Sequence, residues 1–196
     1  MLKIDGLCRP GLQPASFTLA AGECVVVQGA SGAGKSLLLR AIADLDPNQG
    51  RVSLDGHDRA EMAATAWRAR VGYVPAEPGW WADRVDAHFL NWNDSLARRL
   101  NLPDGMGTAM VVQLSTGERQ RLALLRALER QPHVLLLDEP TAALDATATA
   151  LVEELLAERR AGGMAQLWVS HDADQAARLG GRRLVVEHGR VREEGA

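Results

Sequence analysis

The feature that most constrains this 196-residue chain is a glycine-rich segment, GASGAGKS, at positions 29–36. An apolar stretch of strand length, Glu23–Gln28, precedes it, and a helix-like stretch, Leu37–Leu45, follows it. Its three glycines allow the tight backbone curvature through which successive N–H groups point at phosphate oxygens. The positive N-terminal end of the following helix favours the same anion. The pattern G-x-x-x-x-G-K-[ST] between a strand and a helix therefore predicts a phosphate-binding loop.

The whole loop is expected to line the phosphate site, through Gly29, Ala30, Ser31, Gly32, Ala33, Gly34, Lys35 and Ser36. The Lys35 ammonium can neutralise the β- and γ-phosphates of a nucleoside triphosphate, and the Ser36 hydroxyl can ligate Mg²⁺. The alternative is a glycine-rich turn with an incidental lysine. That alternative does not explain why the complete pattern occurs between a strand and a helix.

Apolar runs of strand length alternate with amphipathic stretches along the chain, a pattern typical of an α/β fold. Strands are expected at 2–4, 16–19, 23–28, 51–54, 71–74, 133–137, 166–170 and 183–187, with a final hairpin at 191–192. Helices are expected at 37–45, at 118–128 and over the leucine-rich stretch around 151–156. The predicted architecture is a P-loop NTPase core of mainly parallel sheet, with an N-terminal antiparallel β portion and a small helical insert.

Residues 78–113 differ in composition from their flanks, with three tryptophans, three asparagines and no strong strand pattern. We therefore expect a single domain over 1–196. Its α/β core would comprise 1–77 and 114–196, and 78–113 would form the helical insert.

Composition excludes several classes of protein. A formal net charge of -3 argues against a broad basic surface for nucleic acid, so no nucleic-acid partner is expected. Cys8 and Cys24 form neither a disulfide framework nor a metal-binding spacing, which favours a reducing compartment. No apolar run approaches the ~20 residues that cross a bilayer, and the first residues lack the apolar stretch of a signal peptide. We expect a cytoplasmic protein that reaches a membrane only through a partner.

A second part of the phosphate site is predicted by HVLLLDEP, residues 133–140. Four apolar residues carry Asp138 to the C-terminal edge of the sheet, where α/β proteins bind ligands. Asp138 is expected to hold Mg²⁺ through water, and Glu139 to polarise the attacking water. Alone, an acidic pair after a strand is equally consistent with a helix N-cap. Together with the phosphate loop, it indicates nucleotide hydrolysis.

The segment LSTGERQ, residues 114–120, resembles the LSGGQ signature of the ABC ATPases and precedes the HVLLLDEP strand as it does in that family. Farther on, TAALD at 141–145 resembles the family's D-loop, and SHD at 170–172 resembles its switch-histidine region. The segment at 114–120 is also consistent with a helix N-cap, in which Ser115 or Thr116 caps and Glu118 lies in the first turn. Because the resemblance covers nearly the whole chain, the chain is identified as a member of the ABC ATPase family.

This resemblance implies an enzyme that binds ATP and Mg²⁺ and hydrolyses ATP as a head-to-tail pair of subunits, most simply two copies of this chain. The catalytic residues would be Lys35, Glu139 and His171, and the metal ligands would be Ser36 and Asp138. From the other subunit, Ser115 and Gly117 would close the ATP site. ATP binding would close the pair, and hydrolysis would reopen it.

The resemblance further implies an ATP-binding subunit of an ABC transporter, peripheral on the inner face of the cell membrane. A separate integral membrane subunit would dock near Glu77–Trp81. Runs such as EPGWWADRV and LWVSHD are similar to small bacterial ATPases described as iron or metal exporters. The first alternative is a soluble ABC ATPase of translation or DNA repair, although the chain lacks the tandem domains, coiled coils and zinc cysteines of those relatives. The second is a P-loop kinase, in which LSTGERQ and His171 would have no role.

The chain departs from the family pattern at three places. Ala76 stands where the family usually has a glutamine, and a methyl group can neither contact Mg²⁺ nor bind the attacking water. We therefore expect weakened hydrolysis or weakened coupling, unless Glu77 substitutes for the glutamine. No aromatic residue between Gly6 and Pro14 can stack on adenine, which leaves the guanidinium plane of Arg9 as a candidate. Thr116 replaces a glycine of the signature.

Overall fold

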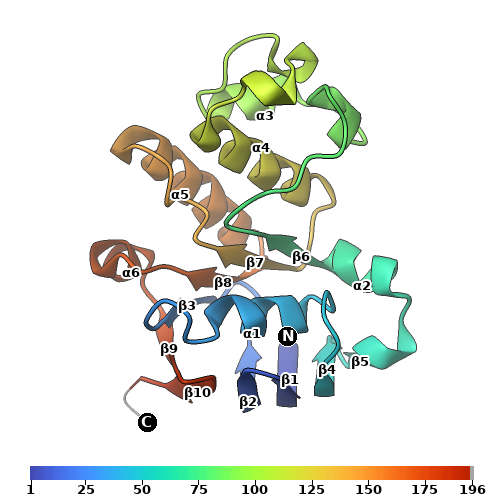
Figure 1. The fold of residues 1–196 in the computed structure, drawn as a ribbon, viewed down its shortest axis with the longest axis vertical. Coiled ribbons are helices and arrows are strands. Elements are labelled where there is room, and N and C mark those ends of the chain that lie inside the picture. The colour runs from blue at the N-terminus through green and yellow to red at the C-terminus, as the bar shows by residue number, and fades with distance from the viewer. Residues whose placement is uncertain (195–196) are drawn as a thin grey trace.

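The computed structural model describes residues 1–194, and its first helix, α1 (Lys35–Ile42), lies between two sheets (Figure 1). Leu38, Leu39 and Ile42 of this helix belong to one buried cluster with side chains from both sheets. The helix follows β3 (Cys24–Gln28) after the glycine-rich loop. The segment predicted to bind phosphate is therefore fixed at both ends to the hydrophobic core.

The larger sheet has six strands in the order β10-β9-β3-β8-β7-β6. Its parallel strands are β3, β6 (Val71–Val74), β7 (Val134–Asp138), β8 (Ala165–Val169) and β9 (Arg182–Glu187). The edge strand β10 (Arg190–Glu193) returns antiparallel to β9, as expected for the final hairpin. Every residue of β7 and β8 is buried, because helices or strands cover both faces of the sheet. The prediction of a mainly parallel sheet is confirmed.

The smaller sheet is antiparallel, in the order β2-β1-β4-β5, and confirms the predicted N-terminal β portion. It comprises β1 (Leu2–Arg9), β2 (Leu12–Leu19), β4 (Gln49–Leu54) and β5 (His57–Asp58). β1 continues well past the predicted end, because a register shift at Gly6, whose φ is 61°, lets the strand resume beyond Asp5-Gly6. The Ser16 hydroxyl accepts the Gly6 N–H at 2.9 Å across this irregularity.

The opposite face of the larger sheet packs against α4 (Thr116–Glu129) and α5 (Ala146–Ala161), with Trp168 fully buried between them and the sheet. Two helices were not expected, α2 (Ala64–Arg70) and α6 (Ala173–Leu179). Both have seven residues, too few to show a clear helical period of apolar residues. Within residues 1–194, no helix combines the length and the hydrophobicity that crossing a membrane requires.

Between β6 and α4, the chain forms only short helices. These are the 3₁₀ turns Asp86–His88, Met106–Thr108 and Val111–Gln113, the six-residue α3 (Asp94–Arg99), and the connecting loops. Buried side chains of this segment, Val85, Leu100, Leu102 and Met106, join the same cluster as α4. Figure 1 shows α3 and its loops stacked over α4, on the side away from the smaller sheet.

An ion-pair cluster at the end of α1 joins the β1–β2 hairpin to that helix. Asp46 accepts hydrogen bonds from Arg9 at the end of β1 and from Arg40 of α1, whose Nε and Nη2 lie at 2.7 and 2.8 Å. Hydrogen bonds from Arg40 and then Arg9 lower the pKa of the Asp46 carboxyl from 3.8 to about 2. Because the folded-state pKa is lowered, the stabilisation is complete above pH 3.8 and is lost as the pH falls toward 2.

We predict that Asp46→Asn lowers the free energy of unfolding at pH 7 by about 1 kcal/mol, after allowance for solvent screening. Urea unfolding of both proteins between pH 7 and pH 3 would measure this difference, which should shrink below pH 4. Asp104→Asn, which removes an exposed partner of Arg98, is the control and should change little. A loss for Asp46→Asn that is equal at every pH would contradict the prediction.

Candidate nucleotide site

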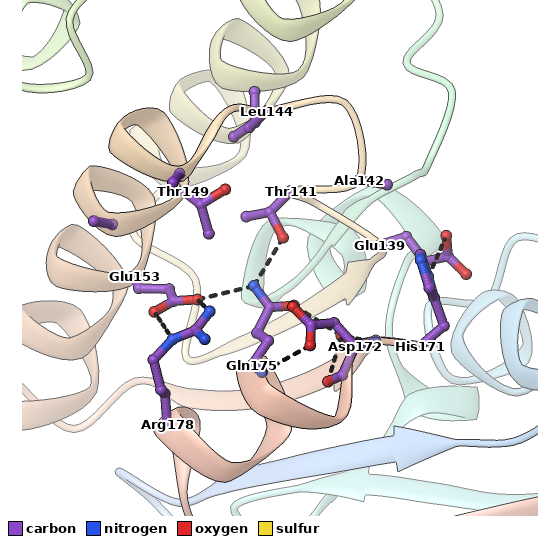
Figure 2. A pocket seen from close by; sticks show the side chains of 13 residues that line it. Glu139, Thr141, Ala142, Leu144, Thr149, Glu153, His171, Asp172, Gln175 and Arg178 are labelled. Atoms are coloured by element: carbon purple, nitrogen blue, oxygen red, sulfur yellow. Dashed lines mark hydrogen bonds and ion pairs between the residues drawn. The ribbon is translucent and has the colours of Figure 1, made fainter.

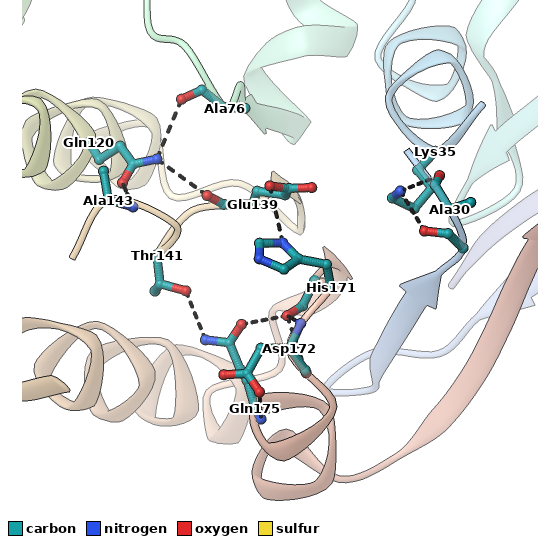
Figure 3. A network of polar contacts seen from close by, with 12 residues as sticks. Ala30, Lys35, Ala76, Gln120, Glu139, Thr141, Ala143, His171, Asp172 and Gln175 are labelled. Atoms are coloured by element: carbon teal, nitrogen blue, oxygen red, sulfur yellow. Dashed lines mark hydrogen bonds and ion pairs between the residues drawn. The ribbon is translucent and has the colours of Figure 1, made fainter. Parts of the chain in front are cut away.

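The glycine-rich loop curls around the end of its own lysine. Lys35 is the first residue of α1 and is buried, and its Nζ donates to the carbonyls of Gly29 at 2.8 Å and Ala30 at 2.9 Å. The ammonium therefore lies inside the curve of the loop, where a phosphate would meet it together with the loop N–H groups (Figure 3). The first turn of α1 contains no acidic residue that would repel an anion.

Backbone conformation explains two of the loop glycines. Gly29 has a φ of 151°, and a Cβ there would lie 2.2 Å from the carbonyl oxygen of Val186 on β9. Gly34 caps α1 in the left-handed region with a φ of 111°. Neither position accepts a side chain without moving the backbone.

Asp138 ends β7 and is buried at the C-terminal edge of the sheet, as predicted. The Tyr73 hydroxyl on the neighbouring strand β6 donates to its Oδ2 at 3.0 Å. Burial, and then the charge of Asp138, raise the pKa of the Tyr73 phenol, so this hydroxyl remains a donor. A carboxylate oriented by one donor is a suitable oxygen ligand for a hard cation.

The structure brings Glu139 and His171 together, as predicted for one site. They follow the adjacent parallel strands β7 and β8, and His171 Nδ1 lies 3.3 Å from Glu139 Oε2 (Figure 3). Glu139 has a φ of 49°, a left-handed conformation that is unfavourable for a residue with a side chain. Its N–H donates to the Val169 carbonyl at 3.1 Å. The backbone that carries the carboxylate is thus tied to β8.

The helix after Leu114 begins with a complete capping box, so the N-cap alternative for LSTGERQ also describes this segment. The Glu118 N–H donates to Ser115 Oγ at 3.3 Å, and the Ser115 N–H donates to Glu118 Oε2 at 2.8 Å. Hydrogen bonds from the Ser115 hydroxyl and N–H lower the pKa of Glu118. Ser115 and Thr116, at the start of this helix, are exposed.

Comparison with known proteins identifies the family. The family model "ABC transporter" matches residues 12–142. The chain is 36% identical over 174 positions to the "Probable iron export ATP-binding protein FetA" of Escherichia coli, covering 82% of this chain and 77% of that protein. The chain belongs to the ABC transporter family. The predicted resemblance to ATP-binding subunits, a described iron exporter among them, is confirmed.

A second curated relative and a solved structure are also similar to this chain. The sulfate/thiosulfate import ATP-binding protein CysA of Caulobacter vibrioides is 35% identical over 206 positions, covering 95% of this chain but only 60% of CysA. The structure of a dimeric ATP-binding cassette bound to ADP and phosphate superposes with a TM-score of 0.83 at 23% identity, over 100% of both chains. This last likeness confirms the P-loop fold of the ABC cassette.

Two buried glutamines of this ABC chain were missed by sequence reasoning. Gln120 of α4 and Gln175 of α6 contact the segment 139–143 from two sides (Figure 3). The Gln175 amide donates to Thr141 Oγ1 at 2.8 Å and to Glu153 Oε1 at 2.9 Å, and its Oε1 accepts the Ser170 hydroxyl at 2.8 Å. Each glutamine precedes a leucine by four residues, but other polar residues of α4 share this spacing, so the sequence does not single them out.

Beside Gln175, a cavity of about 470 Å³ opens between the ends of α5 and α6 (Figure 2). Glu139 and His171 line it at one end, and the ion pair Glu153–Arg178 lines it at the other. The cavity therefore borders the predicted site on the side of α6.

The departures from the family pattern have structural counterparts. Ala76 and Glu77 are exposed, and the Ala76 carbonyl accepts a hydrogen bond from Gln120 at 3.4 Å. The Arg9 guanidinium is ion-paired with Asp46, so its charge is partly compensated. Its stacking on adenine stays a prediction.

We predict different effects for alanine at two loop glycines of this ABC chain. Gly29→Ala must displace the loop or β9, so we expect a loss of stability above about 2 kcal/mol and at least tenfold weaker ATP binding. Gly32 has a φ of 75° with open space at its Cβ position, so Gly32→Ala should cost only about 1 kcal/mol of left-handed strain. Urea unfolding and titration with a fluorescent ATP analogue would measure both. Equal effects would show that the contact with Val186 is unimportant.

Proposed function

We propose that this chain is the ATP-hydrolysing subunit of an ABC transporter, peripheral on the cytoplasmic face of the membrane through a separate membrane subunit. The observation that carries the proposal is the pairing of Glu139 and His171 at the sheet edge that also carries the phosphate loop. The relatives named above are import and export ATP-binding proteins, which favours transport over the alternative in translation or DNA repair.

In this proposal, Glu139 polarises the attacking water and Lys35 neutralises the phosphate oxygens. The Glu139 carboxylate is half-buried, whereas the His171 side chain is 68% exposed. His171 can therefore turn from Glu139 toward a γ-phosphate without leaving a buried group unpaired. Its second role would be to hold the Glu139 carboxylate near the water position before ATP binds.

Ser36 and Asp138 fit the role of Mg²⁺ ligands. Both offer the oxygen donors that Mg²⁺ prefers, and Asp138 is oriented by the Tyr73 hydroxyl. Among residues 1–194, no group of three or more His, Cys, Asp or Glu side chains could form an all-protein metal cage. This agrees with the usual Mg²⁺ site, in which one or two protein ligands are completed by phosphates and water. When bound, Mg²⁺ would neutralise charge on the β- and γ-phosphates.

We propose that two copies of this chain pair head to tail, so that Ser115 and Gly117 of one copy close the ATP site of the other. The exposed start of α4 supports this arrangement. Gly117 packs closely against the TAALD segment, since a Cβ there would lie 3.1 Å from the Ala143 carbonyl. A glycine at this position permits that close approach. A phosphate at this helix start would meet free N–H groups and the positive end of the helix.

The membrane subunit is proposed to dock on Trp81. This side chain is 71% exposed, while Trp80 is partly buried. The turn that carries Trp81 is fixed, because His88 Nε2 accepts the N–H groups of Trp81 and Ala82 at 3.0 and 3.1 Å. The Arg126 guanidinium lies 4.8 Å from both indole centroids. A large aromatic side chain held rigidly in solvent is a typical interface anchor.

We predict that Glu139→Gln binds ATP with near-normal affinity but loses at least about 100-fold in kcat. This variant, immobilised with ATP and Mg²⁺, should retain a multi-span membrane protein from detergent-solubilised membranes of the source organism, as identified by mass spectrometry. Lys35→Ala, deficient in ATP binding, is the matched bait and should retain it poorly. Recovery of only ribosomal or DNA-repair components would refute the transporter role.

We also predict that Trp81→Ala weakens binding of that membrane subunit at least tenfold, because it removes the proposed anchor. Its melting temperature should change little, since the side chain is mostly in solvent. Leu90→Ala, at another exposed position (65%) of the same segment, is the control and should bind normally. Equal binding by both variants in a titration with the purified membrane subunit would place the docking surface elsewhere.

A further inference from the structure

The buried Gln120 side chain connects three segments that meet at the site. It is 3% exposed and lies in the second turn of α4. Its Nε2 donates to the carbonyls of Ala76 at 3.4 Å and Glu139 at 3.3 Å, and its Oε1 accepts the Ala143 N–H at 3.2 Å (Figure 3). All three contacts are to backbone groups. Both donor hydrogens and one acceptor of the amide are thus in use.

Gln120 contacts the backbone of Glu139, a residue with a positive φ. The left-handed conformation of Glu139 is unfavourable, and such a residue persists only where its surroundings hold it. Its N–H is fixed by the Val169 carbonyl, and its own carbonyl is held by Gln120 and by the Ala142 N–H at 3.2 Å. Rotation of either peptide would swing the Glu139 carboxylate away from His171.

The same side chain reaches the junction where this chain lacks a glutamine. Ala76 has no polar side chain, but its backbone carbonyl accepts a hydrogen bond from Gln120 Nε2. Gln120 is five residues beyond Ser115, the N-cap of α4. Because an α-helix moves as a rigid element, a shift at this N-cap would move Gln120 with it.

We propose that Gln120 is a positioning residue for ATP hydrolysis: it holds the Glu139 backbone in its left-handed conformation and links it to the Ala76 junction and to Ala143. The orientation of the Glu139 carboxylate then depends on the position of the α4 N-terminus. Gln120 is not a catalytic residue, because it touches only backbone groups. This inference rests on the proposed role of Glu139 as the residue that polarises water.

The chain contains a matched control for a merely structural glutamine. Gln166 is 2% exposed, donates to the Leu156 carbonyl at 2.6 Å and accepts Trp168 Nε1 at 3.1 Å. It is as buried as Gln120 and also satisfies polar partners, but it has no hydrogen bond to residues 139–143. Methionine has a volume similar to that of glutamine, so at either position it fills the same space but removes the hydrogen bonds of the amide.

The first test compares Gln120→Met with Gln166→Met in the purified full chain, at a temperature where both are folded by circular dichroism. Both should have lower melting temperatures. Only Gln120→Met should lose at least about tenfold in kcat, with KM for ATP within about twofold of the parent protein, because a displaced catalytic group slows the reaction without weakening binding. A kcat for Gln120→Met no lower than that of Gln166→Met would overturn the proposal.

The second test uses Gln120→Glu and the pH dependence of kcat. When protonated, the introduced carboxyl donates one hydrogen bond to a carbonyl, and burial raises its pKa toward neutrality. When ionised, it donates none and repels the Glu139 carbonyl. The ratio of its kcat to that of the parent protein should therefore fall as the pH rises from 6 to 9. A constant ratio would overturn the proposal, and Gln166→Glu is the control for titration of a buried carboxyl.

The Glu139→Gln protein, assayed in parallel, separates the two hypotheses. If Glu139→Gln hydrolyses ATP normally, the proposed role of Glu139 is wrong, and the positioning role fails with it. If Glu139→Gln is inactive while Gln120→Met keeps full kcat, only the positioning role is wrong.

Discussion

Parallel hydrogen bonding among β3, β8 and β7 brings the carboxyl ends of three strands to one edge of the sheet, and the candidate site is built on these ends. The phosphate loop leaves β3, Asp138 and Glu139 end β7, and His171 follows β8. The strand register fixes the relative heights of these groups along the sheet edge. Four buried apolar residues in each of β7 and β8 hold that register by hydrophobic packing on both faces.

Around this edge, two polar side chains control the segment 139–143 from opposite sides. Gln120 approaches from α4, whose start is the proposed contact with a second subunit, and Gln175 approaches from α6. Amides suit this task because one side chain donates and accepts at once, whereas a carboxylate would repel the carbonyls. The backbone of the segment is thus ordered in part by side chains that carry no charge.

The sequence was sufficient to predict the elements whose chemistry lies in one contiguous stretch. The phosphate loop and the Asp138–Glu139 pair were predicted from motifs next to strands, and the structure has β3 and β7 at these places. The role of His171 was expected only from the family resemblance. Gln120 could not be predicted, because its role depends on contacts with residues 44 and 19 positions away. The continuation of β1 was hidden by Asp5-Gly6, which looks like a turn but forms a bulge. The short helix α2 depends on tertiary contacts such as buried Trp67, and α6 depends in addition on its Asp172 cap.

Because α1 lies between the two sheets, a core substitution in either sheet can affect the phosphate loop. The leucines that fix the phosphate loop are the same leucines on which the N-terminal sheet is packed. A cavity made anywhere in that shared cluster would reduce the population of the folded state and, by mass action, the apparent affinity for nucleotide, without touching a ligand-binding atom. Conversely, nucleotide in the cell would act as a folding ligand for β1, β2 and β4, because these strands pack on the same leucines as the phosphate loop.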